Sequence, residues 1–303
     1  MSLGHWKRNP LLDKLRGAAP AGEGEGDFFT ASDGVKLFYQ FWLPPGEPDR
    51  VVLCLHGMAG HGHYYSLAAD HLVPDGAAVY CPDYRGHGLS EGARGDLDVA
   101  RNLSDASEFL SLLRTRHPRA PVFLLGESLG AIIAINYAAR FPEGLAGIIL
   151  LAPPLRTRFI PGAREILLLP YYVLSLLIRP REPSIFVTGR EHHGIKNPDH
   201  VTYDRTDPLK PKRIPPHFLT ELRRLMAFGR IAAPSRIALP VIVFQGLKDY
   251  AVDPRGTAAF FDRLAAQDKT LKTYPDGFHA MFTDPSCADL LPTIVAWTKK
   301  SPR

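Results

Sequence analysis

The chain has 303 residues, with 36 Lys and Arg against 31 Asp and Glu, and a net charge of +5. Hydrophobic residues make up 45% and charged residues 22%, which excludes disorder throughout the chain and allows a sizeable core. Three cysteines exclude a disulfide scaffold and a four-cysteine zinc site, and no apolar run reaches the ~18 residues of a membrane span.

The first elements in chain order are a lead segment and a hairpin. Residues 1–25 have no apolar core before a small-residue cleavage site, so we expect a weakly ordered lead without a signal peptide. Residues 27–32 and 35–44 are strand-like and flank Asp33-Gly34. This pair predicts a β-hairpin closed by a type I′ turn.

Strand and helix patterns then alternate along the chain. Six runs, most of them continuously apolar, predict buried strands at 51–56, 77–82, 121–126, 146–151, 240–245 and 269–274. Apolar spacing of three and four predicts helices at 64–73, 98–117, 129–140 and 255–267, and we expect a last helix at 286–300. The alternation predicts an α/β fold with a mostly parallel central sheet and helices on both faces.

Residues 152–240 interrupt this alternation. They hold 13 of the 28 prolines but only 4 of the 26 glycines, and 15 Lys and Arg against 7 Asp and Glu. Proline disrupts ladders and helix interiors, so we expect irregular structure or short helices here. We predict a core of residues 26–151 and 238–303 with 152–237 inserted as a cap, or lid. The basic excess suits an anionic membrane surface or acidic ligands, or else a solvated surface with scattered arginines.

The predicted cap contains an uncharged run at 166–178. Its thirteen residues are too few to span a bilayer, and we expect Pro170 to break the run. Arg164, Arg179 and Arg181 flank it. The run is either a lid helix that dips into a lipid interface or a cap helix packed on the body.

The strongest chemical signal is Gly126-Glu127-Ser128-Leu129-Gly130, a G-x-S-x-G pattern. A buried strand leads into it and a helical run leaves it, as expected for a serine held on a sharp strand-to-helix turn. Such a turn needs small residues two positions away on each side, and it places the hydroxyl at the positive end of a helix. The alternative is that Ser128 is a plain helix N-cap.

A serine hydroxyl becomes a good nucleophile only when a base takes its proton. Where such a turn carries the nucleophile, the acid and then the histidine follow on loops after later strands. Asp249 follows the strand predicted at 240–245, and His279 follows the one at 269–274. Asp253 is a rival acid, but it precedes Pro254 at a predicted helix start and suits an N-cap better. The alternative for His279 is an ordinary surface loop histidine.

Ester chemistry also needs donors for a developing oxyanion. His56-Gly57-Met58 follows a predicted strand, and the N–H groups of Met58 and Leu129 are the expected pair. On its own this loop would be an ordinary glycine turn.

At this point the chain resembles the α/β-hydrolase superfamily, and within it the monoacylglycerol lipase and lysophospholipase group. The matching segments are LHG at 55–57, DYRGHGLSEG at 83–92, GESLGA at 126–131, TDPL at 206–209, GLKDYAVDP at 246–254 and QDKTLKTY to GFH across 267–279. The resemblance implies a Ser128–Asp249–His279 triad, oxyanion donors at Met58 and Leu129, and a cap over an acyl pocket. The chain departs from the group at Glu127, where many relatives have His, and at Ala280, where an acidic residue is common.

We therefore predict a serine hydrolase that cleaves esters of monoacylglycerol type through an acyl-enzyme. Alternatives with the same triad are a lysophospholipase and a general carboxylesterase or thioesterase. A non-catalytic hydrolase-like binding scaffold is the alternative of another class. We expect a cytoplasmic protein that acts on a lipid ester and contacts anionic membranes peripherally through the cap.

No cofactor, metal or nucleic acid is expected. The chain has no G-x-G-x-x-G after a strand and no G-x-x-x-x-G-K-[ST]. His61-Gly62-His63 is not followed by the Asp and His of a binuclear site, and His192-His193 lacks an H-E-x-x-H helix. Few aromatic residues lie among the arginines of the predicted cap, which does not fit nucleic-acid binding.

Overall fold

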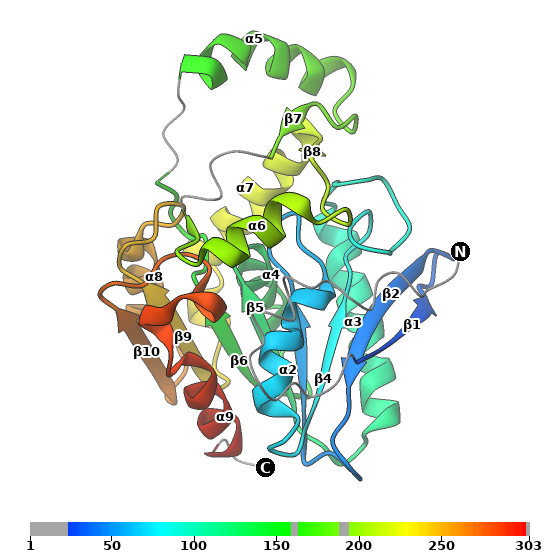
Figure 1. The fold of residues 1–303 in the computed structure, drawn as a ribbon, viewed down its shortest axis with the longest axis vertical. Helices are drawn as coiled ribbons and strands as arrows, with labels where there is room; N and C mark the ends of the chain where they lie inside the picture. Colours follow the sequence, from blue (N-terminus) through cyan, green and yellow to red (C-terminus); the bar gives the residue numbers. More distant parts are fainter. Residues whose placement is uncertain (1–23, 159–162, 188–193, 301–303) are drawn as a thin grey trace.

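The structure is a computed structural model that describes residues 24–158, 163–187 and 194–300. Its centre is an eight-stranded sheet in the order β1-β2-β4-β3-β5-β6-β9-β10 (Figure 1). The strands are β1 (Glu25–Thr30), β2 (Lys36–Trp42), β3 (Arg50–Leu55), β4 (Ala77–Pro82), β5 (Val122–Glu127), β6 (Leu145–Leu151), β9 (Val241–Gly246) and β10 (Lys269–Tyr274). β1 and β2 pair antiparallel at one edge, and every pair from β4 to β10 is parallel.

Helices cover both faces of the sheet and close two apolar cores. One face carries α2 (Ser66–Leu72) and α9 (Leu290–Lys300). The other carries α3 (Val99–Arg116), α4 (Leu129–Ala138) and α8 (Pro254–Asp262), and α7 (Pro216–Ile231) packs against α4. β3, β4, β5 and β9 are buried at every position, as runs that are apolar on both faces require. This arrangement confirms the predicted α/β fold.

The predicted hairpin exists, but the type I′ turn was wrong. Thr30 pairs with Lys36, so five residues connect the strands. The Gly34 N–H donates to the Ala31 carbonyl at 2.8 Å, and Gly34 alone of the connecting residues has a positive φ, at +86°. A type I′ turn needs positive φ at both central residues, so the chain instead makes a wider turn that ends on glycine.

Two helix ends also differ from the prediction. α8 ends at Asp262 rather than near 267. At this end of the helix, Lys269 Nζ donates to the carbonyls of Phe261 and Leu264 at 3.1 and 3.0 Å. A cation at this position stabilises the end of a helix. α9 begins at Leu290 rather than 286, because Pro292 has no N–H and is tolerated only in the first turn.

The segment between β6 and β9 is more helical than its prolines suggested. It contains α5 (Ala163–Ile178), α6 (Pro198–Thr206), α7 and a small two-stranded sheet of β7 (Ile185–Phe186) and β8 (Arg213–Ile214). The expectation of irregular or short elements was wrong, since α5 and α7 have 16 residues each. Pro198 and Pro216 start their helices, where a missing N–H costs nothing. α5 continues through Pro170, which was expected to break it.

The inserted elements lie beyond one end of the strands (Figure 1). α7 packs on α4, and the Asn136 side chain donates to the Leu225 carbonyl at 3.0 Å. α5 stands farthest from the sheet and meets the rest of the molecule at α7. Within the described residues, no helix is both long enough and apolar enough to cross a bilayer. The division into a core and a cap at 152–237 stays a prediction.

Candidate active site

Ser128 stands between the end of β5 and the start of α4. Its backbone has φ 52° and ψ −115°, a conformation that a residue with a Cβ seldom adopts. A Cβ on Gly126 would collide with the Gly130 carbonyl, and a Cβ on Gly130 would collide with the Leu55 carbonyl. Both glycines are therefore required for the helix to approach the sheet so closely. Strain of this kind is typical of functional positions.

The Ser128 hydroxyl is available for chemistry. It makes no hydrogen bond that caps α4, which argues against the alternative of a plain N-cap. The Ser128 N–H donates to the Leu151 carbonyl at 2.9 Å and fixes the turn to β6. No hydrogen bond joins Ser128 and His279, both within the described residues. Free enzymes often form this bond only when substrate is present.

Asp249 and His279 are brought together although 30 residues separate them in the chain. The His279 Nδ1 donates to the Asp249 Oδ2 at 2.7 Å. The other carboxylate oxygen, Oδ1, accepts the N–H groups of Ala251 and Val252 at 2.8 and 2.9 Å. The Asp249 side chain is fully buried, whereas the His279 side chain is 21% exposed. The histidine side chain is therefore partly accessible while the acid stays out of water.

The environment favours the charged forms of both side chains. Burial alone would raise the pKa of Asp249, but the charge and hydrogen bond of His279 and the two N–H donors bring it below its ordinary value. Burial lowers the pKa of His279, yet the charge and hydrogen bond of Asp249 outweigh it and the net pKa is raised. This carboxylate can orient the imidazole and stabilise it once it is protonated.

Asp253, the rival acid, has a different place. It caps α8, with Oδ1 accepting the Arg255 N–H at 3.1 Å. Its carboxylate also pairs with the side chains of Arg156 and Arg255 at 3.0 and 2.7 Å. The structure thus puts Asp253 at the helix start, as its sequence context predicted.

The loop that follows β3 lies beside Ser128. A Cβ on Gly57 would lie 3.8 Å from the Ser128 Cβ, so Gly57-Met58 passes close to the serine. His56 is buried and its Nε2 accepts the Tyr84 N–H at 3.1 Å, which holds the start of the loop. Leu129 is the first residue of α4, so its N–H belongs to the free donors at that helix end. The loop that carries Met58 therefore passes beside the serine and Leu129 follows it directly, and the role of their N–H groups as oxyanion donors stays a prediction.

Glu127 is a site residue whose behaviour the sequence did not reveal. Its side chain is buried, and its Oε1 has no hydrogen-bond partner among the described residues. Burial raises the pKa of Glu127 to about 7, although the charge of His279 and the N–H of Met281 act in the opposite direction. The only signal in the sequence was that Glu127 stands where many members of the resembled group have His.

We expect Glu127→Gln to stabilise the protein at alkaline pH. The folded-state pKa lies above the usual 4.5. The contribution of Glu127 to stability is therefore fully present below pH 4.5 and is lost as pH rises through about 7. The loss is on the order of 3 kcal/mol at pH 8, from about 1.4 kcal/mol per pH unit between the two pKa values. Urea unfolding from pH 5 to 8 measures it, with exposed Glu47→Gln as the control. Parallel pH curves for the wild type and Glu127→Gln would contradict this assignment.

A second feature joins the inserted segment to the loop after β3. His61 Nε2 and Asp207 Oδ2 lie 2.7 Å apart, and both side chains are buried. Burial would raise the pKa of Asp207, but the hydrogen bond and charge of His61 lower it overall. His61 was considered in the sequence only as a metal ligand, and Asp207 only as part of TDPL. In the described part of the chain, no three His, Cys, Asp or Glu side chains are placed to hold a metal ion.

Comparison with known proteins shows the family to which the chain belongs. Residues 46–286 match the family model described as serine aminopeptidase, S33. The chain is 30% identical over 274 residues to a monoacylglycerol lipase of Mycolicibacterium smegmatis, covering 89% of this chain and 95% of the relative. It is also 30% identical over 260 residues to the monoglyceride lipase of Homo sapiens, covering 82% of each.

Solved structures share the fold. The monoacylglycerol lipase of Paleococcus ferrophilus superposes with a TM-score of 0.77 at 25% identity, covering 88% of this chain and 99% of that one. A soluble variant of the Saccharomyces cerevisiae monoglyceride lipase, in complex with a substrate analog, gives a TM-score of 0.80 at 22% identity, covering 95% and 98%. The resemblance drawn from the motifs is confirmed: the chain belongs to the serine aminopeptidase S33 family of α/β-hydrolases, in its monoacylglycerol lipase-like group, and is a carboxylic ester hydrolase.

Proposed function

We propose that this hydrolase cleaves carboxylic esters of monoacylglycerol type through an acyl-enzyme formed on Ser128. The observations that carry the proposal are the 2.7 Å bond between Asp249 and His279 and the positive φ of Ser128, whose side chain makes no hydrogen bond that caps α4. Relatives that align over most of the chain are named monoacylglycerol and monoglyceride lipases, which supports the substrate class.

The mechanism follows from the placement of these groups. Ser128 Oγ attacks the ester carbonyl while His279 Nε2 takes its proton. Asp249 holds the Nδ1–H of His279 and stabilises the imidazolium. The N–H groups of Met58 and Leu129 bind the oxyanion. The alcohol leaves with the proton from His279, and a water molecule, deprotonated by the same nitrogen, attacks the acyl-enzyme and releases the acid.

A panel of substrates tests the proposal. Purified protein is given a chain-length series of monoacylglycerols, with lysophospholipids, p-nitrophenyl esters and thioesters alongside. We expect the highest kcat/KM on a monoacylglycerol. A preference for lysophospholipids or thioesters would be compatible with the proposed triad but would overturn the assignment of monoacylglycerol as the substrate. Failure to hydrolyse any ester, together with no labelling by a fluorophosphonate probe, would favour a non-catalytic scaffold.

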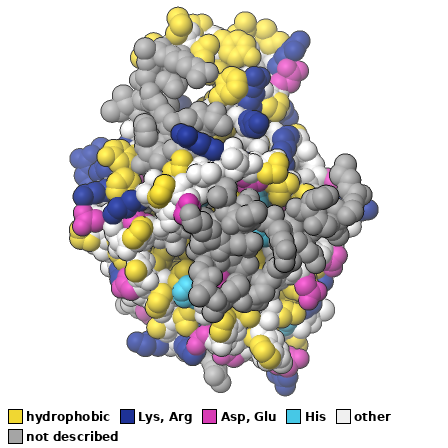
Figure 2. All heavy atoms as spheres, viewed as in Figure 1, with side chains coloured by type: hydrophobic (Ala, Val, Ile, Leu, Met, Phe, Trp, Pro, Cys, Tyr) yellow, Lys and Arg dark blue, Asp and Glu magenta, His cyan; other side chains and the backbone are white. Residues whose placement is uncertain are grey.

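We further propose that α5 contacts lipid at a membrane surface. Nine large apolar side chains of α5 are at least 40% exposed: Ile166, Leu167, Leu169, Tyr171, Val173, Leu174, Leu176, Leu177 and Ile178. Figure 2 shows hydrophobic side chains gathered at the top of the molecule, over α5. Such exposure does not support the alternative of a helix packed on the body, since a patch of this size is typical of an interaction site.

The charges beside α5 contribute less than the sequence suggested. Arg179 pairs with Glu182 at 3.1 Å, and Arg181 pairs with Asp96 at 2.8 Å and Asp98 at 3.2 Å. Each guanidinium is therefore partly neutralised within the protein. Apolar burial, at about 25 cal/mol per Å², should dominate the attraction, and salt should weaken it only slightly.

We expect the double substitution Leu167→Ser and Leu177→Ser to reduce vesicle binding and the turnover of long-chain esters. These two side chains are 80% and 76% exposed, so their replacement should not disturb packing. Turnover of a short soluble ester should survive, because the triad lies on the body. Vesicle sedimentation and kinetics on both substrates measure the effect. Leu43→Ser, exposed after β2, is the control. Equal losses on short and long esters would reject lipid contact by α5.

A further inference from the structure

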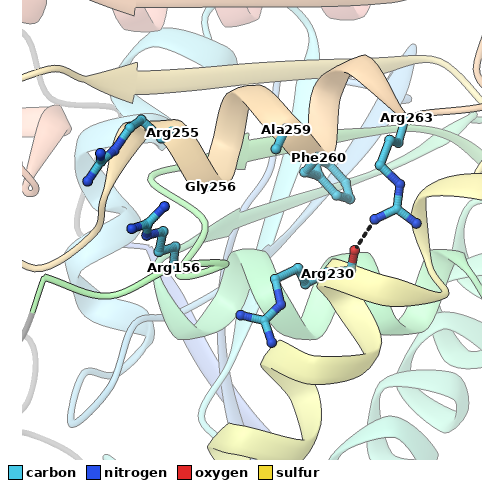
Figure 3. Close-up of a pocket in the computed structure, with 7 residues that line it drawn as sticks. All are labelled: Arg156, Arg230, Arg255, Gly256, Ala259, Phe260 and Arg263. Atoms are coloured by element: carbon cyan, nitrogen blue, oxygen red, sulfur yellow. Dashed lines mark hydrogen bonds between the residues drawn. The ribbon is translucent and has the colours of Figure 1, made fainter.

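Four arginines surround a small pocket between α7 and α8, away from Ser128. The pocket has a volume of about 270 Å³. Arg156 comes from the chain after β6, Arg230 from α7, Arg255 from the start of α8 and Arg263 from just beyond its end. Figure 3 shows the four side chains set around this space, with Phe260 beside them. Lys and Arg side chains also gather at the left of Figure 2, at the height of α8.

The protein holds three of these guanidinium groups in place. Arg263 donates to the carbonyls of Arg230 and Ile231 at the end of α7, each at 2.8 Å. Arg156 and Arg255 share the carboxylate of Asp253. The guanidinium of Arg230 forms no ion pair or hydrogen bond among the described residues. Each guanidinium has five N–H donors, so most donors around the pocket are still free to bind a ligand.

The charge of the pocket favours a multiply charged anion. The pocket has four guanidinium groups and the one carboxylate of Asp253, which leaves three net positive charges around a volume of about 270 Å³. A single carboxylate ligand would leave most of that charge unmatched. The volume lies below the ~300 Å³ at which pockets for larger organic ligands begin. Guanidinium forks match the spacing of phosphate oxygens and bind them through paired hydrogen bonds.

We propose that this pocket is a binding site for a phosphate dianion, either a free phosphate ester or the phosphate monoester head group of a lipid. The ligand binds the donors of Arg156 and Arg255 that Asp253 does not use, and it gives Arg230 a partner. The buried ring of Phe260 supplies an apolar wall for the carbon atoms next to the phosphate.

The position of this site links it to the segment that carries Asp249. Thr157 bridges Val252 in an antiparallel pair, and the Asp253 N–H donates to the Arg156 carbonyl at 2.7 Å. One residue farther along, Arg158 Nη1 donates to the Asp249 carbonyl at 2.8 Å. The segment that supplies Arg156 to the pocket therefore also supports the acid of the proposed triad.

Isothermal titration at low ionic strength tests the site with inorganic phosphate and glycerol 3-phosphate as probes. We expect both probes to bind the wild type, and Arg230→Gln combined with Arg156→Gln to weaken binding at least tenfold. Arg230→Gln alone, which leaves the pairs of Asp253 intact, should weaken it severalfold. Arg119→Gln, an exposed arginine between α3 and β5, should have no effect. Wild-type protein that binds neither probe, or a double variant that binds like the wild type, overturns the site as one for free phosphate esters.

Vesicles distinguish the two sources of phosphate. Sedimentation is compared for phosphatidylcholine vesicles with and without phosphatidic acid. A preference for phosphatidic acid that the double variant loses assigns the pocket to a lipid head group. Binding of the soluble probes without that preference assigns it to free phosphate esters. A double variant that still binds the soluble probes and still prefers phosphatidic acid overturns the proposal. The Ser128→Ala protein can be used in every arm, so these results do not depend on the proposed ester hydrolysis.

Discussion

We expect Ser128→Ala to lose ester hydrolysis and fluorophosphonate labelling while it stays folded. Removal of a nucleophile that works with a base lowers kcat by about 10⁴–10⁶. The fold should persist, because the strained turn depends on Gly126 and Gly130 and on the Ser128 backbone N–H, none of which the substitution changes.

Hydrolysis of the best monoacylglycerol, with circular dichroism and thermal unfolding, measures this effect. Ser235→Ala, on an exposed turn, controls for loss of a hydroxyl elsewhere. A purified Ser128→Ala protein that keeps a tenth of the activity would remove Ser128 as the nucleophile.

The second large effect is expected at Asp249. Asp249→Asn should lower kcat by roughly 10⁴, because an amide beside Nδ1 favours the wrong tautomer of His279 and cannot stabilise the imidazolium. Asp253→Asn should leave kcat within a few-fold of the wild type. Asparagine also caps helices, and Asp253 touches Arg156 and Arg255 rather than His279.

Steady-state kinetics on both variants, after unfolding curves show that each is folded, give the comparison. The two aspartates are four residues apart on one loop and serve as matched controls for each other. The reverse ranking would move the role of the acid from Asp249 to Asp253.

Much of the fold follows from local sequence pattern. Strands buried on both faces are continuous apolar runs, and their predicted ends agree with the structure within one residue. The turn at Ser128 could be predicted because its backbone needs Gly126 and Gly130, and glycine is visible in a sequence. Asp249 follows the buried strand β9 and His279 follows the partly exposed edge strand β10, so the parallel topology alone places them at one end of the sheet.

The errors arise where position mattered more than composition. The proline count predicted a loss of helix, but Pro198 and Pro216 occupy first positions of helices, where proline is favoured. The raised pKa of Glu127 depends on what packs around its carboxyl, which no local pattern records. The partners His61 and Asp207 are 146 residues apart and share no spacing signature.

The buried bond between His61 and Asp207 constrains one half of the inserted segment more than the other. Substitutions in the half that contains α5 should be tolerated more easily than substitutions in the half that follows α6. The half after α6 is bonded to the loop that carries Met58, so a change at Asp207 also reaches this proposed oxyanion donor. α5 has no such bond among the described residues, and most of its side chains face away from the protein. A chimera that exchanges α5 with a relative should therefore fold and keep its turnover chemistry. An exchange that extends through Asp207 needs a compatible residue at position 61.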